Sequence, residues 1–141
     1  MDAFDFSTVA QQKALLRAKQ EKVKITYQIM NIEDFKALKQ YDAVALIYAH
    51  LDPELRKKFH SEIAKSLQTA GYLIFEAFAK EQKNRTSGGP KEEALLYDAP
   101  SICNDFQNLY ILSCGQKEVD LQEGAFHKGK AHLLRLTAQK I

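Results

Sequence analysis

Asp5 is the first residue whose type and position suit chemistry. It ends a short predicted strand and precedes Ser7, a favoured N-cap for the helix that follows. A carboxylate at such a junction can accept hydrogen bonds from both vicinal hydroxyls of a ribose, because it has two acceptor oxygens and no donor. The alternative is that Asp5 only helps to cap the helix.

Three more polar or aromatic side chains follow predicted strands. Asn31 can hydrogen-bond the edge of an adenine, since its amide both donates and accepts, or it is an ordinary turn residue. His50 can orient a substrate or take a proton near neutral pH, or its ring is satisfied by the cap of the next helix. Tyr48 lines the same pocket or packs.

Glu76 and His127 are weaker candidates for substrate contact. Glu76 interrupts an apolar strand, and because a carboxylate is costly to bury alone it faces a cleft or pairs with a lysine. We favour the cleft. His127 lies in a glycine-flanked loop, as a lid residue or as an exposed loop histidine. We expect His60 and His132 to be surface or sheet residues.

Several known signatures are absent from the sequence. It contains no G-x-x-x-x-G-K-[ST] phosphate loop, no G-x-S-x-G elbow, no H-E-x-x-H and no G-x-G-x-x-G. Cys103 and Cys114 form neither a C-x-x-C pair nor a zinc-type spacing with histidine, so we expect two reduced cysteines packed as small apolar residues. We predict no metal site.

The elements that position these residues alternate between helix and strand in the first half of the chain. Residues 9–20 form a predicted helix, and residues 23–29 alternate apolar and polar side chains like an edge strand. A polar connection with one helical turn leads to 43–49, a strand expected to be buried on both faces. Asp52 and Pro53 start a helix with an apolar stripe, and 72–78 form a second doubly buried strand.

The second half of the chain is less regular. Residues 79–91 form a polar loop with a Gly-Gly-Pro stop, and 92–106 are helical in pieces, interrupted at Pro100. Strands at 109–114 and 131–138 are joined by a loop containing EGAFHKGK, a hairpin-like return that makes the last strand antiparallel. The whole pattern predicts an α/β fold with a parallel sheet. In such sheets a ligand lies beyond the carboxyl ends of the strands, here at 5–7, 31–34, 47–51 and 76–82.

Composition restricts the class of protein. The chain has 141 residues, a net charge of +2, 45% hydrophobic and 27% charged residues, which suits one domain with a real core. Basic residues are scattered, so we expect no nucleic-acid partner. We find no signal peptide and no apolar run long enough for a membrane span, and we expect a cytoplasmic protein without a membrane partner.

Several segments together resemble class I S-adenosylmethionine-dependent methyltransferases. FDFSTVAQQKALLRA looks like their motif after the second strand, and NIEDF resembles their adenine-side segment. YDAVALIYAHLDPELRKKFHSEIAKSLQTAGYLIFEAF resembles their fourth strand, following helix and fifth strand. The later stretches TSGGPK and EGAFHKGKAHLLRLTAQK are similar to the small tellurite-resistance and thiopurine-methyltransferase-like group. The likeness runs over essentially the whole chain.

The resemblance implies a cofactor, S-adenosylmethionine, and a set of residues that hold it. Asp5 matches the ribose-binding acid, with Phe6 beside it, and Asn31 and Ile32 match the pair that flanks adenine. Ile47, Tyr48 and His50 match the loop beside the methyl donor and acceptor, with His50 as the candidate catalytic residue. The fold implied is a Rossmann-like methyltransferase sheet, mostly parallel with an antiparallel last strand.

The sequence also departs from the family pattern. Counterparts of the family's first strand, first helix and glycine-rich loop are missing, so we expect residues 1–141 to be a single, partial methyltransferase domain, truncated at its N-terminus. In the family's order the missing strand lies between the strand ending at Asp5 and the strand 43–49. The first functional hypothesis is methyl transfer to a small-molecule acceptor. The alternative is a truncated, non-catalytic domain that pairs with another chain through exposed strand edges, as a homo-oligomer or swapped dimer.

Overall fold

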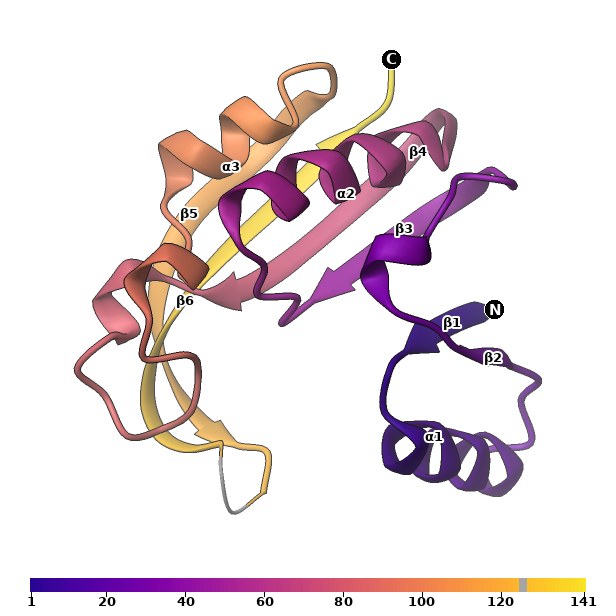
Figure 1. Ribbon diagram of the computed structural model, residues 1–141, viewed down its shortest axis with the longest axis horizontal. Helices are drawn as coiled ribbons and strands as arrows, with labels where there is room; N and C mark the ends of the chain where they lie inside the picture. Colours follow the sequence, from indigo (N-terminus) through magenta and orange to yellow (C-terminus); the bar gives the residue numbers. More distant parts are fainter. Residues whose placement is uncertain (125–126) are drawn as a thin grey trace. The chain divides into compact units, whose positions relative to one another are not determined.

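The computed structural model describes residues 1–124 and 127–141. The chain divides into two units, Met1–Lys36 and Ala37–Ile141, and each is described by itself. Most of the buried apolar side chains belong to the second unit. This unit has a four-stranded sheet with two helices on it (Figure 1).

The first unit contains two short parallel strands and one helix. Its elements are β1 (Asp2–Asp5), α1 (Thr8–Gln20), β2 (Thr26–Ile29) and the 3₁₀ turn η1 (Ile32–Asp34). Ser7 caps α1 as predicted, because its hydroxyl accepts a hydrogen bond from the amide of Ala10 at 3.1 Å. The strand predicted at 23–29 is shorter in the structure, because β1 offers only four residues for pairing.

The second unit is a mixed sheet with the order β3-β4-β6-β5. Its strands are β3 (Tyr41–Ile47), β4 (Leu67–Phe78), β5 (Tyr110–Gln122) and β6 (Lys128–Gln139). β3 and β4 are parallel, whereas β6 is antiparallel to both β4 and β5. The expected antiparallel last strand is confirmed. The expectation of a mostly parallel sheet is not, since the described chain has two parallel and two antiparallel pairings.

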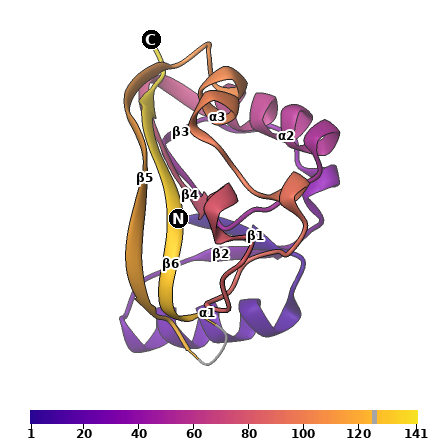
Figure 2. The ribbon, with the colours of Figure 1, turned by 90° about the vertical axis from the view of Figure 1, so that its left-hand side faces the viewer.

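The last two strands are longer than predicted. β5 and β6 run side by side as a long curved hairpin (Figure 2). Their outer halves carry polar side chains, with Glu118 opposite His132 and Asp120 opposite Lys130. These polar residues lack the apolar alternation from which the strands 109–114 and 131–138 were predicted. Pairing between the two strands of the hairpin nevertheless keeps them in strand conformation.

Helices α2 (Pro53–Lys65) and α3 (Ala99–Asp105) lie on the same face of this sheet (Figures 1 and 2). Asp52 starts α2 as predicted, because its Oδ1 accepts from the amides of Glu54 and Leu55. Pro100 does not interrupt a helix: it lies in the first turn of α3, where its missing N–H costs nothing. The short 3₁₀ turns η2 (Lys80–Gln82) and η3 (Glu93–Leu95) precede α3.

The prediction that β3 and β4 are buried on both faces is wrong. Leu73 and Phe75 are buried beneath the helices, but Ile47 and Ile74 on the other face are each 48% exposed. Within Ala37–Ile141, helices cover only one face of the sheet, so a continuous apolar run here does not mean burial on both sides.

The prediction that His60 is a surface or sheet residue is also wrong. His60 is fully buried on α2, beside the predicted apolar residues Phe59 and Ile63. Its imidazole Nδ1 lies 2.9 Å from the carboxylate of Asp105 in α3, and this partner allows a polar ring to lie in the core. Among the described helices, none has the length and apolar character needed to cross a membrane.

Candidate functional site

In the first unit, Asp5 and Asn31 lie at the same end of the two parallel strands. Asp5 is paired with Ile29, and the amide of Met30 donates to the Asp5 carbonyl at 3.2 Å, so Asn31 follows directly. This end is the carboxyl end of both strands, where α/β proteins hold ligands. The expected placement of Asp5 and Asn31 at one edge is therefore seen.

The carboxylate of Asp5 is partly used for local structure. Its Oδ1 accepts a hydrogen bond from the amide of Ser7 at 2.7 Å, which fixes the start of α1. This bond corresponds to the capping alternative for Asp5. A carboxylate has two oxygens, so Oδ2 is left as an acceptor for a ligand hydroxyl.

The residues around Asp5 combine polar and apolar surface. Phe6 is 74% exposed, and Ile32 is half-buried in η1. Asn31 is the N-cap residue of η1, but its amide side chain makes no capping hydrogen bond and is exposed. Burial, and secondly the negative charge of Asp5, raise the pKa of Tyr27 on β2.

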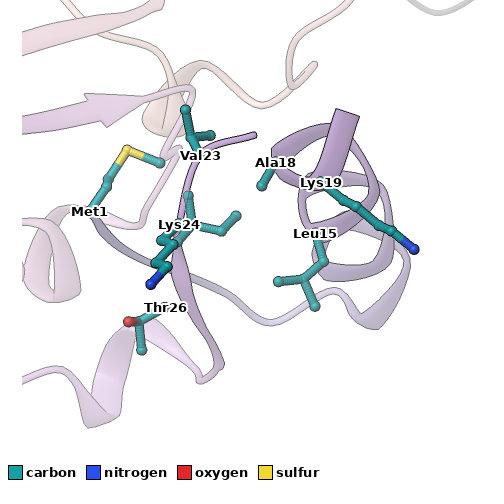
Figure 3. Close-up of a pocket in the computed structure, with 8 residues that line it drawn as sticks. Met1, Leu15, Ala18, Lys19, Val23, Lys24 and Thr26 are labelled. Carbon is teal, nitrogen blue, oxygen red and sulfur yellow. The ribbon is translucent and has the colours of Figure 1, made fainter. Parts of the chain in front are cut away.

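A separate hollow in the first unit lies at the opposite end of the strands (Figure 3). Its lining includes Leu15 and Ala18 of α1 and Thr26 at the start of β2. Met1 also lines it, and the amide of Thr26 donates to the Met1 carbonyl, so the hollow is at the amino end of β1 and β2. It does not include Asp5, Asn31 or Ile32.

In the second unit, the carboxyl ends of β3 and β4 bring together Ile47, Tyr48 and Glu76. Ile47 is paired with Glu76, and the amide of Tyr48 donates to the Glu76 carbonyl at 2.8 Å. The Glu76 carboxylate pairs with Nε of Arg135 on β6 at 2.5 Å. Glu76 thus has a cationic partner on the neighbouring strand, an arginine where a lysine was considered.

Tyr48 is held in an unusual conformation beside two aromatic rings. Its backbone φ of +52° lies in the left-handed region, which is uncommon for residues with a side chain and is frequent at functional sites. Its ring stacks on Phe78 at 4.9 Å and on His127 at 5.9 Å. Its hydroxyl is buried and interacts with the carboxylate of Glu76.

The Tyr48 hydroxyl stays protonated at neutral pH. Burial is the main cause that raises its pKa to about 12, and the negative charge of Glu76 is the second. The phenol is therefore a hydrogen-bond donor rather than a base in this position. A neutral donor beside a carboxylate is suited to holding a polar group of a small molecule.

Both nitrogens of His50 are engaged by backbone groups. Nδ1 lies 2.7 Å from the carbonyl of Leu95, and Nε2 accepts from the amide of Phe78 at 3.3 Å. This pattern requires a neutral ring with the proton on Nδ1, and burial lowers the pKa of His50 in agreement. Both ring nitrogens thus have hydrogen-bond partners, which agrees with the structural alternative given for His50. The partners are Leu95 and Phe78, however, and not the cap of the next helix.

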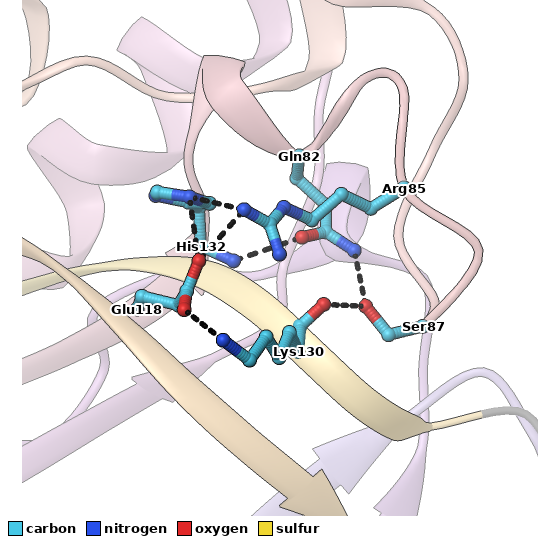
Figure 4. A network of polar contacts seen from close by, with 6 residues as sticks. All are labelled: Gln82, Arg85, Ser87, Glu118, Lys130 and His132. Carbon is cyan, nitrogen blue, oxygen red and sulfur yellow. Dashed lines mark hydrogen bonds and ion pairs between the residues drawn. The ribbon is translucent and has the colours of Figure 1, made fainter.

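A polar network fixes the loop that follows β4 (Figure 4). The buried amide of Gln82 donates to the hydroxyl of Ser87 and to the carbonyl of Gly88, and its oxygen accepts from the amide of His132. Ser87 in turn donates to the carbonyl of Lys130 at 2.6 Å. The loop is therefore bound to the start of β6 through two buried side chains, Gln82 and Ser87.

The same loop supports the aromatic rings. Gly89 has a φ of +82°, and a Cβ placed there would lie 2.8 Å from the Phe78 ring. Phe78 stacks on Tyr48 and on His50, with centroid distances of 4.9 and 5.6 Å. Only glycine allows this approach, so the Gly-Gly-Pro segment sets the position of the ring on which the candidate site residues stack.

Sequence reasoning did not assign site roles to Phe78, Gln82 or Arg135. Arg135 follows from strand register alone, because it stands opposite Glu76 from a position 59 residues away. The glycine pair was the one local signal for the Phe78 contact. No group of three or more potential metal ligands occurs in the portion of the chain that the structure describes.

No protein-family model matches the sequence, and no curated protein matches it either. Comparison with solved structures gives clear likenesses. TehB from Haemophilus influenzae superposes with a TM-score of 0.77 at 12% identity, covering 99% of this chain and 49% of TehB. The chain has a methyltransferase-like fold.

Two further similar structures are of methyltransferases with the cofactor or its product bound. The N-methyltransferase NodS from Bradyrhizobium japonicum, in complex with S-adenosylhomocysteine, has a TM-score of 0.72 at 14% identity, covering 99% of this chain and 65% of NodS. The magnesium protoporphyrin IX methyltransferase ChlM from Synechocystis, with bound S-adenosylmethionine, has a TM-score of 0.66 at 16% identity, covering 99% of this chain and 59% of ChlM. The chain spans about half the length of TehB.

Proposed function

We propose that this chain takes part in S-adenosylmethionine-dependent methyl transfer to a small-molecule acceptor. The observation that carries the proposal is the strand order β3-β4-β6-β5 with its antiparallel β6, within a fold shared over 99% of the chain with two structures that hold this cofactor or its product. Membership of the small tellurite-resistance and thiopurine-methyltransferase-like group remains part of the proposal.

Four residues are proposed for the nucleoside part of the cofactor. Asp5 accepts from the ribose through Oδ2, since Oδ1 is already bound to Ser7. Asn31 hydrogen-bonds the adenine edge with an amide that no capping bond occupies, while Ile32 and the exposed Phe6 contribute apolar contact. The donor and acceptor types of these residues fit an adenosine.

A further set of residues is proposed for the reacting end of the cofactor and for the acceptor. When bound, the cofactor provides a methyl group already activated on a sulfonium, so the protein mainly positions the acceptor and excludes water. Ile47 and Tyr48 line the cofactor side, and Glu76 and His127 the acceptor side. His50 takes a proton from the acceptor only if Nε2 gives up its bond from the Phe78 amide, so we assign it first to orientation.

Calorimetric titration with S-adenosylhomocysteine tests the proposal. Two variants are compared, one expected to change the affinity and the other the stability of the fold. Asp5→Asn keeps an oxygen that accepts from Ser7 but removes the charge, so we expect the fold to be retained and affinity to fall at least about tenfold. Ser7→Ala removes the hydroxyl cap, so we expect lower stability with affinity nearly unchanged.

The proposal is overturned if the folded chain binds no S-adenosylhomocysteine. The role of Asp5 alone is overturned if Asp5→Asn binds as tightly as the unmodified chain. Circular dichroism of each variant separates loss of binding from loss of fold. Methylated product from candidate acceptors, detected by mass spectrometry, then identifies the substrate class.

A second function is assembly with another copy of the chain through strand edges. β3 is paired on one side only within Ala37–Ile141, and its outward face carries the exposed residues Ala45 and Ile47. Unpaired edges with apolar side chains favour pairing with another strand. The occupant we propose is the same edge of a second copy.

Light scattering across a range of protein concentrations tests this assembly. We expect a dimer that Ala43→Lys on β3 converts to a monomer, because a lysine on an edge strand opposes pairing. Thr69→Lys on the exposed part of β4 is the matched control and leaves the dimer intact. A monomer at every concentration, with the fold intact, removes this candidate.

A further inference from the structure

A β-bulge in β5 determines which face of the sheet Cys114 occupies. Ile111 pairs with Ala138, but the next pair is Ser113 with Thr137, so Leu112 is an extra residue on β5. Side chains alternate along a strand, and one extra residue shifts the alternation by one position. Ile111 and Cys114 therefore share one face, although their spacing of three would otherwise place them on opposite faces.

That face is the one covered by helices. Cys114 pairs with the buried Leu136, which pairs with the buried Phe75 beneath the helices. The extra residue Leu112 is 48% exposed on the other face. The bulge thus turns the Cys114 thiol toward the helix layer of the second unit.

Helix α3 carries the second cysteine of the chain over this position. α3 packs against β5, and Cys103 follows the fully buried Ile102 and precedes the fully buried Phe106. Figure 1 shows α3 beside the first part of β5. Both thiols are free and half-buried, so they remain within reach of small reagents.

The two cysteines are neighbours across the packing of α3 on β5, and their side chains interact. Burial first, and the neighbouring Cys103 thiol second, raise the pKa of Cys114 to about 12. Cys114 therefore stays protonated at neutral pH and is a slow nucleophile. The arrangement is a dithiol in which Cys114 is the shielded, slower member.

We propose that Cys103 and Cys114 form a redox-active dithiol that closes to an intramolecular disulfide between α3 and β5. The oxidant is a low-molecular-weight disulfide. The Cys103 thiolate attacks it, forming a mixed disulfide and releasing one thiolate. The Cys114 sulfur, losing its proton, then displaces the second thiolate. Two protein thiols are oxidised and one small disulfide is reduced to two thiols.

Closure would join the last turn of α3 to the start of β5 across the short connection 106–109. α3 also carries Asp105, which pairs with Arg56 and His60 of α2. The disulfide therefore links the helix layer to the edge strand covalently. This inference does not depend on the proposed methyl transfer.

The test is oxidation of the full chain by oxidised glutathione, followed by intact mass measurement and thiol counting in denaturant. We expect the unmodified chain to lose the mass of two hydrogen atoms and both free thiols without a lasting adduct. Cys114→Ser should accumulate one glutathione on Cys103. Cys103→Ser should react much more slowly, because only the shielded Cys114 remains.

Peptide mapping locates the bond. Trypsin has no cleavage site between Cys103 and Cys114, whereas chymotrypsin cleaves after Phe106 or Tyr110 and gives two peptides that stay joined until reduction. The oxidised chain should also unfold at a higher temperature than the reduced chain. Glutathione adducts on both cysteines, or a disulfide-linked dimer, in place of the internal bond would overturn the proposal, as would equal reaction rates for the two single variants.

Discussion

His50 and His60 lie ten positions apart in the sequence, yet the two rings are held in different ways. His50 follows a strand, and backbone groups of Leu95 and Phe78 bind both of its nitrogens. His60 lies inside the core on α2, where Nδ1 meets the Asp105 carboxylate and Nε2 has no hydrogen-bond partner within residues 1–124 and 127–141.

The difference separates a positioning role from a packing role. The His50 ring ties the end of β3 to the end of β4 and to the segment before α3, so its loss would free two backbone groups. The His60 ring mainly fills space among aromatic side chains, with Phe106 at 4.7 Å, and has one polar tie. The carboxylate of Asp105 also binds Nε of Arg56 at 2.8 Å. Asp105, and not His60, is therefore the residue that connects the polar side chains of this cluster.

Asp105→Ala should give the largest effect. The Asp105 side chain is 1% exposed, and removing it leaves the Arg56 charge without its partner in a mostly buried place. We expect unfolding free energy to fall by about 3–5 kcal/mol, measured as the shift of the urea midpoint. Glu93→Ala, in the exposed pair with Lys83, is the control and should leave the midpoint unchanged. Similar small shifts for both variants would contradict the central role of Asp105.

Gly89→Ala should weaken the His50 region next. The new Cβ would meet the Phe78 ring at 2.8 Å, and φ is +82°. We expect a loss of roughly 2–3 kcal/mol from overpacking together with backbone strain. Gly124→Ala is the matched control: its φ is +105°, but among the described residues, apart from its chain neighbours, no atom lies within 4 Å of the new Cβ, so it isolates the backbone part. If both variants lose equal stability in urea, contact with Phe78 is irrelevant.

His50→Phe and His60→Phe compare the two rings directly. The first leaves the Phe78 amide and the Leu95 carbonyl unpaired, for which we expect a loss of about 2 kcal/mol. The second keeps a ring in the core and leaves Asp105 paired with Arg56, for which we expect about 1 kcal/mol. Urea midpoints at pH 7.5 rank the pair. The reverse order would make His60 the more important structural histidine.

The pH dependence of stability should be smaller than any of these single effects. Burial lowers the folded-state pKa of both His50 and His60, so the unfolded chain binds more protons as the pH falls below about 6.5. Stability should be constant above that pH and decrease from pH 6.5 toward 5.5. The double variant His50→Phe/His60→Phe should flatten this part of the profile. An unchanged slope would assign the acid sensitivity to other groups.

The sequence predicted local features of this fold well. Ser7 and Asp52 were identified as caps because capping needs only the residue type and the helix that follows. Asp5 and Asn31 were placed at one edge because the carboxyl ends of parallel strands meet there. The pairing of Glu76 with Arg135 could not be predicted, because no local sequence pattern determines the register of two strands that lie 59 residues apart. The buried His60 was missed because its carboxylate partner lies on another helix.

Strand β4 also determines when the sheet can be completed during synthesis. It pairs with β3, which precedes it, and with β6, whose last residue is made roughly 60 residues after Phe78. At about 5–20 residues per second, the apolar edge of β4 would wait for roughly 3–12 s before its second neighbour exists. The β5–β6 hairpin, whose contacts are local, can form as one piece and then close that edge in a single docking step. A nascent chain stopped before residue 128 would therefore carry a central strand with one unpaired edge and be a natural client for chaperones.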